Sequence, residues 1–269
     1  MSGNGWGISW WNSSLFSVLL LFLLSASPLA GETTLFTTCP KQRNGECVIL
    51  LHGMARSHRA MTEMEEGLNA AGYCTVNLDY PSTDLSIEEI AATSLPKAIE
   101  SCNHFNPSAI HFVTHSLGGI IVRQLLATSR PQNLGKVVML SPPNRGSTAT
   151  DTLKEWWFYD WLNGPAGQQL STDSHSLPNR LGPAEFPLGI ITGDRHAFFD
   201  FWLSKIIPGP DDGKVGVEQA KLAGMTDFLV VHESHPFIMN APDVVAQTCF
   251  FLKNGRFAPS ASIKTGGKK

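Results

Sequence analysis

The chain has 269 residues, of which 42% are hydrophobic and 16% charged, and its formal net charge is −3 at pH 7. A chain of this length and hydrophobic content can bury one large core, so we expect a globular protein of one or two domains. The small net charge and the lack of a dense Lys/Arg cluster argue against a nucleic-acid partner.

The first 30 residues contain a ten-residue apolar block at residues 15–24. Its length is that of the hydrophobic region of a signal peptide and falls short of the roughly 20 residues that a membrane-spanning helix needs. We therefore expect residues 1–30 to direct export to the periplasm or the medium. No Lys or Arg precedes Lys41, and Trp10 and Trp11 would suit a membrane interface, so an uncleaved membrane anchor is the alternative.

The cysteines are widely spaced and form no C-x-x-C pair, which argues against a zinc ribbon or a thioredoxin-type site. They are Cys39, Cys47, Cys74, Cys102 and Cys249. An exported protein could form one or two disulfides from them and keep one thiol. The first pairing to test is Cys39 with Cys47, because Pro40 and Asn44-Gly45 favour a tight reversal between them. Cys249 lies in an apolar run and is expected to be a small buried hydrophobe.

Short apolar runs typical of strands alternate with helical patterns from residue 31 to residue 255. Strands are predicted near residues 33–38, 47–53, 73–78, 110–115, 136–140, 186–192 and 228–232, and helices near 61–71, 86–101, 117–129 and 244–252. Pro96 is expected to perturb the second helix. This alternation predicts an α/β domain with a mainly parallel sheet covered by helices on both faces.

An insertion at residues 144–185, rich in Gly, Pro, Ser and aromatic residues, separates two of the predicted strands. Long excursions of this kind are commonly lids or binding loops. The aromatic cluster at residues 156–161 either packs the insertion onto the core or covers an acyl pocket, and the sequence leaves both options open. Residues 256–269 are expected to form a flexible tail.

Ser116 stands where an apolar strand turns sharply into a helix. Such a turn lifts a serine side chain clear of the sheet and aims the next main-chain amide, that of Leu117, at a reacting carbonyl oxygen. Gly118 and Gly119 allow the close contacts that the turn needs, although Thr114 replaces the first glycine of the G-x-S-x-G pattern. We interpret Ser116 as a nucleophile; an ordinary strand-to-helix junction with a capping serine is the alternative.

A second amide is predicted at the carboxyl end of the first parallel strand. In His52-Gly53-Met54 the glycine lets the main chain bend, so that the amide of Met54 can face the same space as that of Leu117. Two such amides would form an oxyanion hole. The His52 side chain itself is interpreted as structural.

An acid and a base follow in the order expected for a Ser-His-Asp triad on a parallel sheet. Asp212 is the predicted acid, in preference to Asp211, because it abuts a glycine whose flexibility can turn the carboxylate inward. His235 is the predicted base, because it lies in a loop beyond the last strand, whereas His232 is still at the strand end. The spacing of these two histidines does not match a zinc-binding helix, and we expect neither a metal nor another cofactor.

Four segments together resemble the α/β-hydrolase superfamily, within its lipase- and esterase-like group. They are residues 48–53, 114–119, 212–215 and 234–235, and the resemblance extends over residues 48–252. It implies oxyanion donors, nucleophile, acid and base at these four places in turn. It also implies a compact form of the fold, because the chain before residue 47 has room for at most one leading strand.

We therefore expect a serine hydrolase that cleaves carboxylic esters through an acyl-enzyme, with a small-molecule or lipid ester as its substrate. Contact with a membrane surface is a further option. The alternatives are acyl transfer, amide hydrolysis on the same triad, and a binding protein on a hydrolase fold without catalysis.

Overall fold

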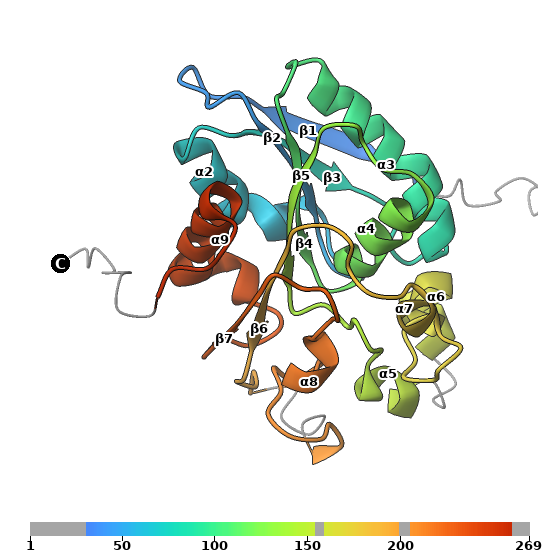
Figure 1. Cartoon of the computed structure of the whole chain (residues 1–269). Helices are drawn as coiled ribbons and strands as arrows, with labels where there is room; N and C mark the ends of the chain where they lie inside the picture. Colours follow the sequence, from blue (N-terminus) through green and yellow to red (C-terminus); the bar gives the residue numbers. More distant parts are fainter. Residues whose placement is uncertain (1–30, 154–158, 199–204, 260–269) are drawn as a thin grey trace, which may run out of the picture.

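The computed structural model describes residues 31–153, 159–198 and 205–259, without the side chains of residues 153–163 (Figure 1). The predicted signal peptide or anchor and most of the aromatic cluster therefore lie outside the described residues. A seven-stranded sheet with the order β1-β3-β2-β4-β5-β6-β7 forms the centre. Its strands are β1 (Thr34–Thr38), β2 (Cys47–Leu51), β3 (Cys74–Asp79), β4 (Ile110–His115), β5 (Leu134–Leu140), β6 (Leu188–Gly193) and β7 (Asp227–Val231).

Every strand pair is parallel except that between β1 and β3, which is antiparallel. The predicted fold class is thus confirmed, and so is the single leading strand. β2 and β4 lie next to each other in the middle and are buried along their whole length, because helices cover both faces of the sheet. The carboxyl ends of these two strands carry the predicted oxyanion turn and the predicted nucleophile.

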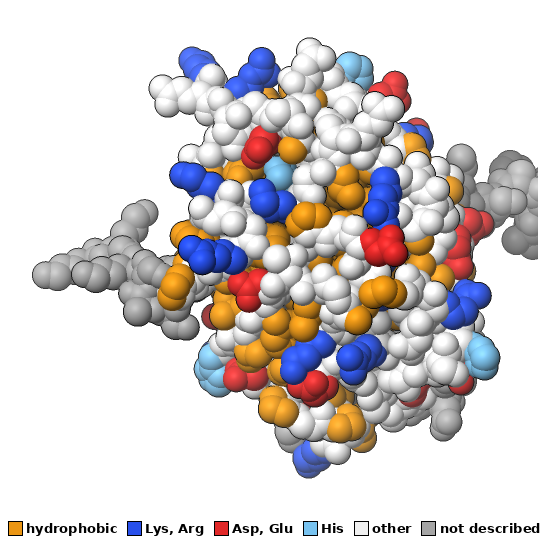
Figure 2. Space-filling model, in the orientation of Figure 1, with side chains coloured by type: hydrophobic (Ala, Val, Ile, Leu, Met, Phe, Trp, Pro, Cys, Tyr) orange, Lys and Arg blue, Asp and Glu red, His pale blue; other side chains and the backbone are white. Residues whose placement is uncertain are grey.

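Two pairs of helices form the outer layers (Figure 1). α2 (Thr62–Ala70) and α9 (Pro242–Asn254) lie on one face, and α3 (Ile87–Asn103) and α4 (Leu117–Thr128) on the other. Side chains of β2 alternate between the two layers: Ile49 packs with the α3/α4 layer, and Val48 and Leu50 pack with the α2/α9 layer. Charged side chains of both signs are interspersed on the face shown in Figure 2.

α3 continues through Pro96, contrary to the expected perturbation. Proline removes one main-chain hydrogen bond, here the bond to the carbonyl of Ala92. Both residues are exposed, so water can solvate that carbonyl and the helix continues. At the amino end of α3, Ser86 and Glu89 form a reciprocal capping box that starts the helix.

Two disulfides each join the carboxyl end of one element to the amino end of a neighbouring strand, and neither is the pair Cys39–Cys47 that we predicted first. Cys39 bonds Cys74 and Cys47 bonds Cys102. The reason is the topology: β1 runs antiparallel to β3, so its end lies beside the start of β3, and β2 starts beside the last turn of α3. Cys249 is a free thiol, and it is half-buried, not fully buried as we expected. Disulfides of this kind form and persist in oxidising compartments.

In its described residues, the insertion has three short helices, α5 (Thr148–Leu153), α6 (Tyr159–Gln168) and α7 (Leu177–Arg180), which gather at one end of the sheet (Figure 1). The buried guanidinium of Arg123 in α4 holds both of its ends. It donates to the carbonyl oxygens of Asn144 at 3.0 Å and of Pro178 and Gly182 at 2.9 Å each. The base of the insertion is therefore fixed to the core.

The carboxyl end of the domain reaches further than the predicted boundary. Phe257 and Ala258 are buried, and the Gln247 side chain exchanges two hydrogen bonds with the main chain of Ala258. These residues are packed, so a tail starting at residue 256 is wrong for them. Among the described residues, no helix has the length and apolar character to cross a bilayer.

Candidate active site

Ser116 lies between β4 and α4 with φ 52° and ψ −119°. A serine at positive φ is strained and persists only where its surroundings hold it. Its amide donates to the carbonyl of Leu140 in β5 at 2.9 Å, which fixes the turn to the sheet. A side chain at Gly118 would put its Cβ 2.8 Å from that of Leu51, so the turn needs a glycine where α4 crosses β2.

The turn after β2 packs directly against the serine turn. A Cβ at Gly53 would lie 2.7 Å from Nδ1 of His115 and 3.3 Å from the Cβ of Ser116. Within the described residues, no hydrogen bond occupies the main-chain amide of Met54 or that of Leu117. Two amides beside the same serine are thus available to a ligand, as an oxyanion hole requires.

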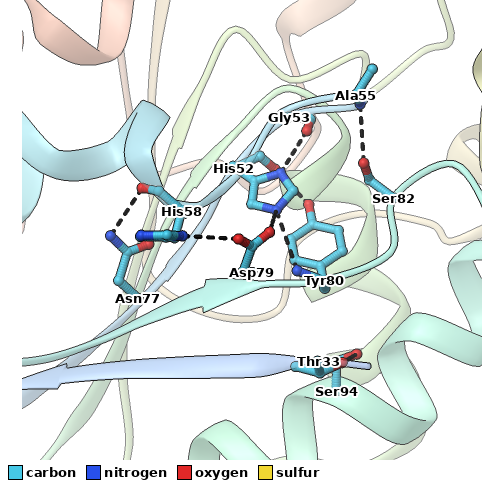
Figure 3. A network of polar contacts seen from close by, with 10 residues as sticks. All are labelled: Thr33, His52, Gly53, Ala55, His58, Asn77, Asp79, Tyr80, Ser82 and Ser94. Carbon is cyan, nitrogen blue, oxygen red and sulfur yellow. Dashed lines mark hydrogen bonds and ion pairs between the residues drawn. The ribbon is translucent and has the colours of Figure 1, made fainter. Parts of the chain in front are cut away.

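His52 orients the turn that carries Met54 (Figure 3). Its Nε2 faces the amide of Tyr80 at 3.4 Å and accepts from it, so Nδ1 carries the proton and donates to the carbonyl of Gly53 at 2.7 Å. Since a peptide group is planar and trans, holding this carbonyl points the amide of Met54 the opposite way. Burial lowers the pKa of His52 from its usual 6.5 to about 4, which keeps the ring neutral.

Side chains from β3 and the loop after it complete this network (Figure 3). The Tyr80 hydroxyl donates to the carbonyl of His52, and the two rings stack. Burial raises the pKa of Tyr80, so its hydroxyl stays a donor. The Ser82 hydroxyl accepts from the amide of Ala55 at 3.0 Å, where the main chain has a φ of 51°. The Asp79 carboxylate lies 2.9 Å from Nδ1 of His58.

His235 and Asp212 form a buried pair on the neighbouring loops. The distance from Nδ1 of His235 to Oδ2 of Asp212 is 2.9 Å. The other carboxylate oxygen accepts from the amides of Lys214 and Val215 at 3.1 and 2.8 Å. Burial raises the pKa of Asp212, but His235 and the amide of Val215 outweigh it, and the pKa lies below its usual value.

His115, interpreted from sequence as part of the strand, supports the His235 loop. Its Nε2 lies 3.0 Å from the carbonyl oxygen of His235, which can only accept, so Nε2 carries the proton. Burial first, and His235 next, lower the pKa of His115 well below 6.5. The ring therefore remains a neutral spacer between the serine turn and the histidine loop.

Ser116 and His235 line the same cavity, which has a volume of about 160 Å³. Its walls are largely apolar and include Pro143, Leu170 and Val215, the second of these from the insertion. Both turns with free amides border this space. The arrangement can hold a carbonyl compound with an apolar portion next to the serine.

The residues rejected as acid and base, Asp211 and His232, have other partners. Asp211 faces His196, with an Oδ2–Nε2 distance of 3.0 Å, and His232 is exposed and paired with Asp194.

The sequence analysis did not identify Tyr80 as part of the site. A signal was present, because Tyr80 directly follows the strand that pairs in parallel with the His52 strand, and parallel neighbours end at the same edge.

The parallel sheet and the arrangement of the candidate site together point to a protein family. The family model for the alpha/beta hydrolase fold matches residues 46–206, and the chain belongs to this family. The resemblance inferred from the sequence is confirmed.

Among individual proteins, the chain is similar to the lysosomal thioesterase PPT2 of Rattus norvegicus, with 25% identity over 245 residues, 81% of this chain and 79% of the relative. Its fold is also similar to the mature lipase BlEst2 of Bacillus licheniformis, with a TM-score of 0.64 and 19% identity over 82% of this chain and 98% of that one. The monoacylglycerol lipase of Paleococcus ferrophilus has a TM-score of 0.55 and 17% identity, covering 84% and 100%. These two structural likenesses concern the fold alone.

Proposed function

We propose that this protein is an exported serine hydrolase that cleaves carboxylic esters or thioesters through an acyl-enzyme. The observation that carries the proposal is that Ser116 and His235 line one cavity, while His235 is bound to the buried carboxylate of Asp212. Two unoccupied amides beside the serine support the same reaction. The family and the similarity to a thioesterase bring thioesters into the proposal next to esters.

In the first half-reaction, the Ser116 hydroxyl attacks the carbonyl carbon, and Nε2 of His235 takes the hydroxyl proton. The amides of Met54 and Leu117 stabilise the oxyanion. When the bond to the leaving group breaks, His235 gives its proton to the departing alcohol or thiol, which leaves an acyl-Ser116 ester. Asp212 keeps the proton of His235 on Nδ1 and stabilises the ring while it is charged.

In the second half-reaction, water attacks the acyl-enzyme, and His235 accepts a proton from the water and then returns one to Ser116. The products are the carboxylic acid and the free enzyme. Removing one oxyanion donor costs about 100- to 1000-fold in rate in well-studied serine hydrolases, so each of the two amides should contribute substantially to the rate.

The test is fluorophosphonate labelling of the mature protein, followed by mass spectrometry of the labelled peptide. We expect one label, on Ser116, and no label in Ser116→Ala, whose melting temperature should match the wild type. A panel of nitrophenyl esters and acyl thioesters of graded chain length then ranks the substrates. Folded protein that resists the reagent while a reference serine hydrolase reacts would refute the proposal.

The export part of the proposal rests on the two disulfides and the amino-terminal apolar block. Mass spectrometry of the mature amino terminus distinguishes a cleaved signal peptide from a retained anchor. We also propose that the insertion borders the acyl pocket, because Leu170 contributes to its wall.

A further inference from the structure

The turn that carries Met54 also brings a cation to the cavity. Arg56 lines the same space as Ser116 and His235, two residues beyond Met54. The main chain there is held in place, because the amide of Ala55 donates to the Ser82 hydroxyl and Ala55 has positive φ. The position of Arg56 beside the cavity therefore follows from a fixed turn.

The guanidinium of Arg56 has no structural partner in the described part of the chain. It is exposed, and no described carboxylate or carbonyl binds it. Two other arginines have structural partners: Arg123 donates to three carbonyl groups, and Arg130 pairs with Glu185. An exposed arginine that none of the described residues binds, beside a candidate active site, is available to a ligand.

The fully charged side chains among the described residues that line the cavity are both cations. Among its described lining residues, Arg56 and Lys214 carry a full charge and none is acidic, although the chain has a net charge of −3. Both cations act on the buried ring of His115 and lower its pKa, so their field reaches the serine turn. Ser147 fixes the main chain of Lys214 by donating to its carbonyl at 2.9 Å.

We propose that the substrate carries a phosphate group that Arg56 binds, a few bonds from the scissile ester, as in an acylated glycerol phosphate. This inference rests on the proposed function. A guanidinium presents paired donors that match phosphate oxygens. Arg56 and Ser116 line the same cavity, so a phosphate bound by Arg56 would lie close along the substrate to the reacting carbonyl. A phosphate at the far end of a long carrier would not be held at that place.

The experiment compares two esters that differ only in the phosphate: hexanoyl glycerol and hexanoyl glycerol 3-phosphate, both kept below their aggregation concentrations. We expect the wild type to have a kcat/KM about tenfold higher for the phosphate ester, the effect of one charged hydrogen bond. Since the interaction is between charges near the surface, added salt should reduce this ratio.

Variants assign the preference to its residue. In Arg56→Ala the ratio of the two kcat/KM values should fall to near one, and in Arg56→Lys it should be intermediate. Arg59→Ala is the matched control, because it removes an equal charge from an exposed residue that does not line the cavity. Its ratio should equal that of the wild type.

Further substrates separate the sources of phosphate. A lysophospholipid with a hexanoyl chain carries its phosphate as a phosphodiester in the headgroup. If a phosphodiester is enough for binding to Arg56, its kcat/KM should also exceed that of hexanoyl glycerol. Hexanoyl coenzyme A should show no dependence on Arg56. Equal wild-type rates on the two hexanoyl glycerols, or a preference that persists in Arg56→Ala, would overturn the inference and leave the hydrolase intact. Absence of turnover for both, with Ser116 unlabelled, would instead remove the proposed function.

Discussion

His235 is bound to Asp212 twice. Its main-chain amide donates to the carbonyl of Asp212 at 2.9 Å, and its ring donates to the carboxylate at the same distance. The first bond fixes where the loop lies, and the second fixes how the ring is turned. Position and ring orientation can therefore be separated by mutation.

Asp212→Asn should keep the main-chain bond and lose the orienting carboxylate. The amide side chain favours the wrong tautomer of His235, and we expect kcat to fall about 10⁴-fold with little change in the melting temperature. The measurement is steady-state hydrolysis of a nitrophenyl ester together with thermal unfolding. Asp211→Asn is the control: it changes the neighbouring carboxylate, which faces His196. If Asp211→Asn causes the larger loss, the acid is assigned wrongly.

Gly53→Ala should impair the oxyanion hole. The new methyl group would lie 2.7 Å from His115 and 3.3 Å from the Cβ of Ser116, so the turn that carries Met54 must move. We expect kcat to fall by at least about tenfold, towards the loss seen when one donor is removed, with a smaller change in KM. Circular dichroism checks the fold. Gly31→Ala, whose methyl group meets ordinary contact distances, should leave kcat unchanged.

Stability should decrease as the pH falls from 6.5 towards 4. The pKa of His52 is lowered from 6.5 to about 4 by folding, so in this window the unfolded chain binds a proton that the native protein does not. His115 shifts in the same direction. Each such histidine reduces the free energy of unfolding by about 1.4 kcal/mol per pH unit within its window.

Urea denaturation at a series of pH values measures this slope. His52→Gln should reduce it by about 1.4 kcal/mol per pH unit, since glutamine does not titrate. The control is Asn103→Gln, an exchange at an exposed residue that does not titrate, and it should retain the wild-type slope. A wild-type slope in His52→Gln would show that the native ring accepts protons as readily as the unfolded chain.

Both disulfides should stabilise the fold and leave the chemistry untouched. They close sequence separations of 35 and 55 residues. Chain entropy then predicts a loss of about 4 kcal/mol when either pair is replaced by alanines, somewhat more for Cys47 with Cys102. Since both lie at the amino ends of β2 and β3, kcat of the folded variants should be that of the wild type. Cys249→Ala should cost far less. A loss below about 1 kcal/mol for both pairs would contradict the prediction.

The sheet was predictable because its strands are short apolar runs separated by helical patterns. The candidate triad could be proposed from the sequence because its members, Ser116, Asp212 and His235, follow strands that end at one edge. Sequence spacing did not predict the disulfide pairing, since Cys39 lies next to Cys74 only because β1 pairs with β3 in antiparallel fashion. Local turn chemistry between Cys39 and Cys47 carries no information on that pairing.

The contacts that join different elements of the candidate site could not be predicted from the sequence either. His115 points from the end of β4 to the carbonyl of His235, which is 120 residues away. A histidine in an apolar strand has many structural uses, and nothing local selects this one. The bond between Ala55 and Ser82 depends in the same way on how two loops meet.

Arg123 joins the two ends of the insertion through one buried side chain, and this has a consequence for protein engineering. Both ends of the segment between Asn144 and Pro178 are held through main-chain carbonyl groups, and the Asn144 side chain adds a bond from Arg123 to its Oδ1 and a bond from its Nδ2 to the carbonyl of Ala220. A graft between these points should therefore retain Asn144, together with Gln169, whose side chain accepts from the amide of Ile87 and donates to Glu88. Substrate range can then change by exchange of one piece of chain.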